Sequence, residues 1–426
     1  MNILSTKALL GTAVSFALLG TANVASAADL DNLSDDDLLA RIERLEKIIG
    51  PGDKNGVRSG NSKVRVTVNG QINTAARYVN DGEDQGVQFV DNDASSSRFR
   101  ILGEAKLNDR FSAKTNIELD IETNLSSRID LNNQDDGEEV NGGAGSPNFD
   151  FRKVEVVFID KVFGSLSLGQ GTTASDGIFE QDLSGTSVVR DSTQDDGGLD
   201  FVNAAGVQTG VAVGNIFGGF DGNSRDNRVR YDSPKFAGFQ ASGSLETEGT
   251  YDVALSYSNK DLAGFAVKAK AGYFVNNGDN ARLENPDRQT SAAGSVSVLH
   301  KATGLSLTGA VGGVLSPQEN AGPSPVSADA FAWFIRGGWQ GNITDLGKTA
   351  ISASYYNAEN STAAINQAGV TNVDGNWFDV NLVQKIDDLS AELYLSYVRY
   401  DADITGAAAV NTQAINVVIA GSRIKF

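Results

Sequence analysis

In this 426-residue chain, the arginines and the acidic residues of interest lie in segments with different sequence patterns. Arginines occur where apolar and polar residues alternate, whereas acidic residues dominate a less patterned stretch from about 171 to 207. Opposite charges on two sides of a water-filled passage would align polar solutes and set an ion preference. The arginines that we assign to the wall of such a passage are Arg98, Arg100, Arg152, Arg228, Arg230 and Arg336. The acidic residues that we assign to a narrowing loop are Asp176, Glu180, Asp182, Asp191, Asp195 and Asp196.

Other residue patterns do not support catalysis. Gly169–Ala174 matches a dinucleotide fingerprint, but neither a periodic helix nor a βαβ unit surrounds it. His300 is the only histidine, cysteine is absent, and no G-x-S-x-G sequence supplies a nucleophile. The acidic stretches 81–93 and 130–139 match no EF-hand spacing, and the sequence leaves calcium binding there open. We therefore predict no enzyme, no catalytic residue, no cofactor and no metal site.

The element that must hold the arginines is a β-strand. In Ser97–Thr123, two alternating runs flank a turn at Asn108–Asp109. The second run, from Phe111 to Glu122, would place apolar residues on one face of a strand and charged or polar residues on the other. An arginine that faced lipid near the bilayer midplane would cost about 2–4 kcal/mol, so arginines in such strands should face a wet interior.

The same alternation continues to the C-terminus and predicts sixteen strands, if one of the candidate segments 208–217 and 226–233 is counted. The other predicted strands are 63–79, 97–107, 110–124, 149–160, 164–172, 236–247, 250–259, 264–275, 290–301, 304–315, 329–341, 348–358, 375–386, 390–401 and 412–426. Short turns alternate with long polar loops, as in bacterial outer-membrane barrels. We therefore predict an all-β fold, a transmembrane antiparallel β-barrel over 63–426. A soluble β-sandwich shows similar alternation but rarely so many hairpins.

Two N-terminal segments precede the barrel. Residues 1–27 combine Lys7, a short apolar run and a small-residue cleavage site, which predicts a secretory signal peptide. The alternative, a membrane anchor, needs about 20 apolar residues, and the run is shorter. Residues 28–62 begin with a capped amphipathic pattern at heptad spacing, from Leu38 to Ile49, followed by a polar linker. We predict a short periplasmic helix there, either packed on the barrel end or forming a small trimeric coiled coil.

The net charge of −19 argues against a nucleic-acid partner, which requires a basic face. It also biases the local ion atmosphere toward cations. The acids of the stretch 171–207, with Asp200 included, outnumber the wall arginines. We therefore expect mild cation selectivity if the passage is a channel.

Several segments resemble the Gram-negative general diffusion porins. Arg228–Phe239 is similar to their strand–turn–strand signature, and Phe149–Gly169, which contains Arg152, resembles their fourth and fifth strands. Arg98 with Gly103–Glu104 resembles their second strand. The C-terminal strand ends in Phe426, which resembles the signal that the outer-membrane assembly machinery reads. Together these segments extend over about 63–426.

This resemblance implies a sixteen-stranded outer-membrane porin, usually a homotrimer in contact with lipid and lipopolysaccharide. By its position after the fifth strand, the stretch 171–207 resembles the loop that folds into the porin lumen. The implied function is passive diffusion of small hydrophilic solutes and ions. Two alternatives remain open: a substrate-selective porin, for which Lys268 and Lys270 are suggestive, and a structural barrel that tethers the envelope. The acids can also lie on an external loop, and any one arginine can form a salt bridge away from the constriction.

Overall fold

The computed structural model describes residues 56–58, 63–121, 123–132, 149–192, 196–218, 220–276, 289–316, 330–361, 370–406 and 411–426. The predicted signal peptide at 1–27 lies outside these residues. The short helix predicted from Leu38 to Ile49 lies outside them as well. Within the described residues, no helix has the length and apolar character needed to cross a membrane.

The chain divides into two compact units. In the first unit, which includes 63–68 and 103–105, β1 (Gly56–Arg58) pairs antiparallel with the beginning of β2 (Val64–Asn80). The second unit consists of 69–102 and 106–426. It contains the inner loop, the wall contacts and the outer surface that are described below.

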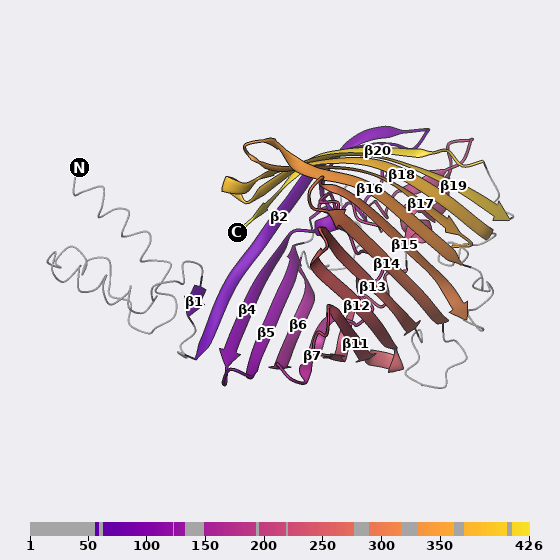
Figure 1. The fold of residues 1–426 in the computed structure, drawn as a ribbon. Coiled ribbons are helices and arrows are strands. Elements are labelled where there is room, and N and C mark those ends of the chain that lie inside the picture. Colours follow the sequence, from indigo (N-terminus) through magenta and orange to yellow (C-terminus); the bar gives the residue numbers. More distant parts are fainter. Residues whose placement is uncertain are drawn as a thin grey trace, which may run out of the picture. The chain divides into compact units, whose positions relative to one another are not determined.

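Sixteen of the described strands form a closed antiparallel barrel, which confirms the predicted all-β barrel but does not test the predicted N-terminal helix. Strands that follow one another in the chain are neighbours, as Figure 1 shows for β11 to β20, and β20 returns to pair with β2. Besides β2, the barrel strands are β4 (Arg98–Lys106), β5 (Phe111–Ile121), β6 (Phe149–Asp160), β7 (Gly164–Thr172), β10 (Arg225–Asp232), β11 (Phe239–Glu246), β12 (Tyr251–Leu262), β13 (Phe265–Asn276), β14 (Gln289–His300), β15 (Leu305–Ser316), β16 (Phe331–Thr344), β17 (Gly347–Glu359), β18 (Val370–Ile386), β19 (Ala391–Gly406) and β20 (Ile415–Lys425). Closure pairs the backbone groups of both edges, which a membrane-spanning sheet requires.

The second position in the barrel is occupied by two successive strands. β3 (Gln85–Asp91) pairs with the later part of β2, and β4 also pairs with β2 after the short helix η2 (Asp93–Ser95). The sequence analysis predicted β4 but treated β3 as part of an acidic loop. A seven-residue strand bounded by Asp and Gly residues has too few alternations to be recognised against that background.

Of the two candidate segments for the sixth strand, 226–233 belongs to the barrel, as β10. The other, 208–217, divides into β9 (Gln208–Ala212) and α3 (Val213–Phe217). β9 pairs with β8 (Asp200–Val202) in a separate two-stranded sheet. Two short helices, η3 (Thr247–Gly249) and η5 (Asp387–Leu389), complete the described elements.

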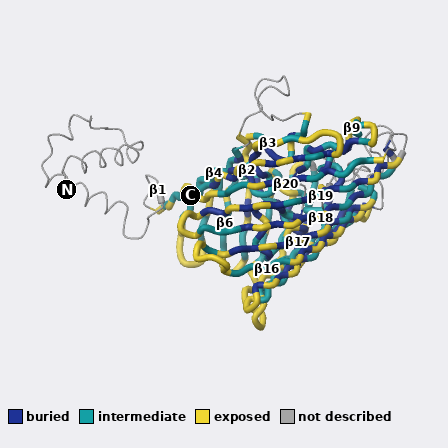
Figure 2. The backbone as a smooth tube through the Cα atoms, turned by 90° about the horizontal axis from the view of Figure 1, so that it is seen from above, coloured by how far each residue is buried: buried dark blue, intermediate teal, exposed yellow. Residues whose placement is uncertain are grey.

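Side-chain burial alternates along the barrel strands, as Figure 2 shows. On β16, Ile335 is 45% exposed, whereas its neighbours Phe334 and Arg336 are 2% and 1% exposed. The exposed apolar set faces outward and forms the surface that contacts lipid in a membrane barrel. The buried set faces inward, so part of the barrel interior is filled.

Candidate pore and its inner loop

The segment between β7 and β10, residues 173–224, lies along the inner surface of the barrel. We call it the inner loop, and 173–192, 196–218 and 220–224 are its described parts. Successive loop residues form hydrogen bonds with one barrel strand after another. In order along the loop, wall partners are Asp252, Ser295, Thr308, Ser352, Tyr400 and Arg77, on β12, β14, β15, β17, β19 and β2. The inner loop is therefore attached to a large part of the wall.

Small inward residues make room for the inner loop. A Cβ atom on Gly312 of β15 would lie 2.5 Å from Cβ of Phe220, and one on Gly375 of β18 would lie 2.8 Å from the ring of Phe217. Buried serine and threonine side chains on the same faces supply hydroxyl partners for the loop backbone, such as Ser295 for the amide of Gln181. Because these partners replace water, the loop backbone can lie at this depth without unsatisfied groups.

An aromatic cluster holds the early and the late part of the inner loop against the wall. Phe217 meets Tyr356 of β17 edge-on, with ring centroids 5.7 Å apart, and lies 5.6 Å from the ring of Tyr400 on β19. Phe179 also packs on Tyr356, which stacks on Trp377 at 5.5 Å. All five side chains are buried. Aromatic pairs of this geometry contribute beyond the area that they bury, so the cluster holds the loop against the wall.

Arg336 on β16 binds the inner loop. Its guanidinium lies 3.3 Å from a carboxylate oxygen of Asp182 and donates to the backbone oxygen of Asp191 at 3.0 Å. On the wall it contacts Asp379 of β18, 3.5 Å away. Burial raises the pKa of Asp182, but Arg336 and hydrogen bonds from Ser184 and Thr308 outweigh it and hold that pKa below its ordinary value. Asp182 and Arg336 thus form an ion pair that joins the inner loop to β16 of the wall.

Asp196 is the centre of a second buried ion cluster. Its carboxylate is 3.0 Å from Arg77 of β2 and 2.8 Å from Arg190 of the loop itself, and it accepts a hydrogen bond from the Tyr400 hydroxyl at 2.9 Å. The side chain is only 1% exposed. Burial raises the pKa of Asp196, but the two guanidinium groups more than compensate and hold that pKa low.

Three of the predicted wall arginines meet on β4 to β6. Arg98, Arg100 and Arg152 lie 3.7, 2.6 and 2.9 Å from the carboxylate of Glu118 on β5. Arg152 also lies 2.6 Å from Asp120. The arginines remain 13%, 35% and 16% exposed, so their charge is accessible from the barrel interior.

A β-bulge aims Arg152 at this cluster. Phe151 lies opposite Leu119 and Lys153 lies opposite Glu118, so Arg152 is an extra residue in β6 relative to β5. Bulges re-aim side chains and often occur beside functional sites. Here the bulge brings the guanidinium of Arg152 within reach of both carboxylates of β5.

The remaining predicted wall arginines lie where the inner loop begins. Arg228 of β10 pairs with Glu155 of β6 at 2.5 Å and donates to the backbone oxygen of Thr172. Arg230 pairs with Asp232 at 2.7 Å and donates to the backbone oxygen of Thr173. Both arginines therefore join the barrel wall to the end of β7.

The other predicted loop acids occupy different environments. The side chain of Glu180 is exposed and those of Asp176 and Asp191 are half-buried, whereas Asp195 lies outside the described residues. Asp176 accepts a hydrogen bond from the Lys270 ammonium through its backbone oxygen. The sequence analysis placed all six acids opposite the basic wall. The structure brings Asp182 and Asp196 into direct contact with arginines, and the role of the others in a transverse field stays a prediction.

Among curated proteins, no sequence matches the chain. The sequence model of the family described as "Gram-negative porin" matches residues 12–420. The chain belongs to the Gram-negative porin family. This porin is therefore a channel-forming β-barrel of the outer membrane.

Solved outer-membrane proteins share the fold of this porin. The channel DcaP of Acinetobacter baumannii gives a TM-score of 0.53 at 13% identity, over 87% of this chain and 100% of that chain. OmpF of Salmonella typhi in complex with daunomycin gives the same four values. The trimer form of in-vitro folded OmpT of Vibrio cholerae gives a TM-score of 0.52 at 15% identity, over 86% and 100%. At these identities the likeness concerns the fold alone.

The sequence analysis missed two residues of the candidate site of the porin. Arg77 lies within an alternating strand, as the predicted wall arginines do. The rule that arginines in such strands face the interior therefore applies to Arg77 as well, and the sequence contained the signal needed to include it. Asp221 of the inner loop had no such signal. Its carboxylate accepts backbone hydrogen bonds from Gly177 at 3.0 Å and Phe179 at 2.9 Å, and thereby joins the two ends of the loop. Burial, and then the nearby Asp176, raise the pKa of Asp221 to about 7.

The C-terminal residue of the porin lies at the seam of the barrel. Phe426 exchanges backbone hydrogen bonds with Gly70 of β2, at 2.9 and 3.0 Å, and its side chain is exposed. His300 is half-buried at the end of β14, where its ring contacts the Thr303 hydroxyl. In the parts of the chain that the structure describes, including 81–93, no three acidic or histidine side chains gather as a metal site would require.

Proposed function

We propose that this porin carries small hydrophilic solutes and ions passively across the outer membrane, without catalysis or a cofactor. The observation that carries this function is the group of partly exposed arginines, Arg98, Arg100 and Arg152, on the inner side of β4 and β6. Charged groups that stay exposed inside a barrel need water around them, because an unsolvated charge is very costly. The described contacts of the inner loop go mainly to β12–β19, which favours an aqueous path beside β4–β6.

We further propose that this path is mildly cation-selective. Asp182 and Asp196 are neutralised by arginines of the wall and loop, so they contribute little to the field in the lumen. Asp176, Glu180 and Asp191, together with the net charge of −19, favour cations. The exposed arginines on the other wall oppose this preference and keep it small.

Planar-bilayer recording in a KCl gradient tests both proposals. We expect stepwise conductance and a reversal potential of the sign that K⁺ permeation produces. Glu180→Gln should reduce the cation preference, whereas Asp261→Asn, which removes an equal charge near the short turn after β12, should leave it unchanged. Absence of conductance from correctly folded protein would contradict the channel, and Cl⁻ preference would contradict the selectivity alone.

We also propose that three copies assemble through the outer faces of β3, β5 and β6. Four phenylalanine side chains on β3 and β6 are 75%, 55%, 54% and 51% exposed, and these are Phe89, Phe149, Phe151 and Phe158. Large exposed apolar patches commonly mark interfaces, and the solved OmpT structure named above is a trimer form. Conductance steps in groups of three and a trimer mass in detergent are the expected results. The rest of the outer surface would contact lipid and lipopolysaccharide.

A further inference from the structure

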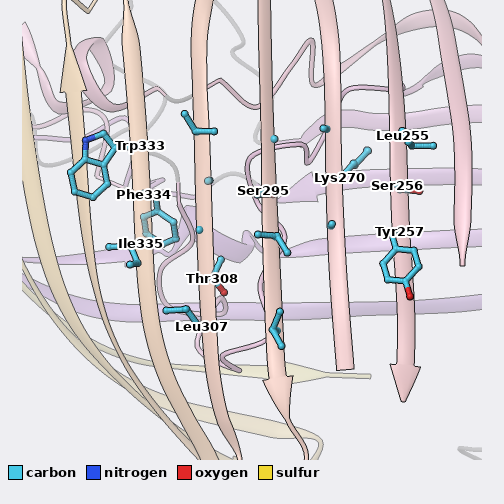
Figure 3. A pocket seen from close by; sticks show the side chains of 18 of the residues that line it. Leu255, Ser256, Tyr257, Lys270, Ser295, Leu307, Thr308, Trp333, Phe334 and Ile335 are labelled. Atoms are coloured by element: carbon cyan, nitrogen blue, oxygen red, sulfur yellow. The ribbon is translucent and has the colours of Figure 1, made fainter. Parts of the chain in front are cut away.

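The outer surface of the barrel has an apolar hollow of about 760 Å³ over β12 to β16. Figure 3 shows Leu255 and Tyr257 of β12 on one side of it and Trp333 and Ile335 of β16 on the other. The strands between them carry small outward residues, including Ala269 and Ala271 of β13, Gly294 of β14 and Gly309 of β15. We call this hollow the outer groove. It exists because these small residues lie between larger outward side chains, such as Val296 of β14 and Leu307 of β15.

The surface of the outer groove offers hydrocarbon and almost no polar group. Besides Tyr257, the polar residues of its lining are Ser256, Lys270, Ser295 and Thr308, and the last three have side chains that are engaged with the inner loop. The Lys270 ammonium donates to the backbone oxygen of Asp176, and the Ser295 hydroxyl donates to that of Ile178 at 2.7 Å. A ligand in the groove would therefore meet mainly apolar side-chain surface.

The outer groove is continuous with the lipid-contacting surface of this outer-membrane barrel. It lies in the half of the barrel near the short turns. Phe239 directly follows the 233–238 turn, and Val298 and Leu307 flank the turn between β14 and β15. Short turns are periplasmic in bacterial barrels, so this half lies in the periplasmic leaflet. The Tyr257 ring packs on Phe239 at 4.7 Å, an amphipathic ring of the kind found at the membrane interface.

We propose that the outer groove seats an acyl chain of a phospholipid from the periplasmic leaflet. Hydrocarbon surrounds the barrel at this depth, and the groove lets one chain contact it on several sides instead of one. Each CH₂ group that gains contact gains dispersion attraction, which adds to the preference for this position over bulk lipid. A second copy of the chain is the less suitable occupant, because the phenylalanine patch of the proposed subunit interface lies on β3 and β6, which are not adjacent to β12–β16.

Two outward glycines provide a matched test. At Gly309 the only atom near an added Cβ is 3.9 Å away, so Gly309→Leu fills the groove without a backbone clash. At Gly337 of β16, which is outside the groove, an added Cβ meets nothing within 4 Å, so Gly337→Leu is the control. Retained lipid is counted by native mass spectrometry on trimers purified in detergent with phosphatidylethanolamine or, separately, lipopolysaccharide added. Unchanged single-channel conductance establishes that each variant is folded.

We expect wild-type protein and Gly337→Leu to retain phosphatidylethanolamine with equal affinity, and Gly309→Leu to bind it several-fold more weakly, because the added side chain occupies the space of the acyl chain and removes its packing contacts. Equal retention by all three proteins, or equal loss in both variants, would overturn the proposal. A defect confined to lipopolysaccharide would also overturn it, because the occupant would then come from the other leaflet. Loss of trimers in Gly309→Leu with lipid retention unchanged would assign the groove to a second copy instead.

Discussion

Replacement of Asp196 by asparagine tests how the inner loop is held. The carboxylate of Asp196 compensates two buried guanidinium groups, those of Arg77 and Arg190, and accepts a hydrogen bond from Tyr400. Asparagine keeps the size of the side chain but removes the charge, so two cations remain in a site that is 1% exposed. Loss of one partner from a buried ion pair costs about 3–5 kcal/mol. The ratio of attached to detached loop should then fall by about two to four orders of magnitude.

The assay is single-channel recording combined with thermal unfolding in detergent. Asp196→Asn should show frequent excursions to larger conductance, because a detached loop leaves more of the lumen open, and it should unfold at a lower temperature. The matched control is Asp401→Asn, which removes a carboxylate from a pair with Arg399 that is about 40% exposed on both sides. Such exposed pairs contribute about 0–1 kcal/mol, so the control should resemble wild type.

Addition of Arg77→Gln to Asp196→Asn gives a further check, because it removes one of the uncompensated cations. The double variant should recover part of the lost stability, with a coupling of about 0.5–3 kcal/mol. The reasoning is refuted if Asp196→Asn is as quiet and as stable as Asp401→Asn. In that case the aromatic cluster and the other wall contacts, such as that of Arg336 with Asp182, hold the loop without Asp196.

Three further predictions concern other parts of the pore. Arg100→Gln should increase cation preference in a reversal-potential measurement with little loss of stability, because Arg100 is 35% exposed; an unchanged potential would remove it from the ion path. The pKa of Asp221 is raised from 3.8 to about 7 in the attached loop, so the attached state binds the proton more tightly, and its stability should be greatest below about pH 4 and be lost as pH rises toward 7. Excursions to larger conductance should therefore be rarer at pH 5 than at pH 8, and Asp221→Asn should abolish this difference. Gly375→Ala should increase such excursions at every pH, because its Cβ would lie 2.8 Å from the ring of Phe217; a variant identical to wild type would show that the ring moves freely.

Alternation was sufficient to predict the barrel because each strand carries its own two-residue signal. Alternation located strands such as β16, where Phe331, Trp333 and Ile335 face outward. It also predicted, without knowledge of any contact between residues, that the wall arginines face the lumen. Strand ends were less well defined, since β18 begins at Val370, five residues before the predicted start.

The course of the inner loop could not be predicted, because its contacts join residues far apart in the chain. Asp196 and Arg77 are 119 positions apart, and no local pattern pairs an acid in an irregular segment with one arginine among several. The same limit applies to Asp182, which binds Arg336 rather than facing it across water. Composition indicated that the loop is acidic but not which of its acids would be buried.

The central claim is that the inner side of β4–β6 borders a water-filled path. A single thiol, introduced as Arg100→Cys in this cysteine-free chain, measures it directly. A charged, membrane-impermeant methanethiosulfonate reagent should modify this thiol and change the single-channel conductance in steps as each subunit reacts. Arg336→Cys, beneath the inner loop, should react far more slowly. Equal rates in the two variants, or modification of the Arg100→Cys variant with no change in conductance, would contradict the account.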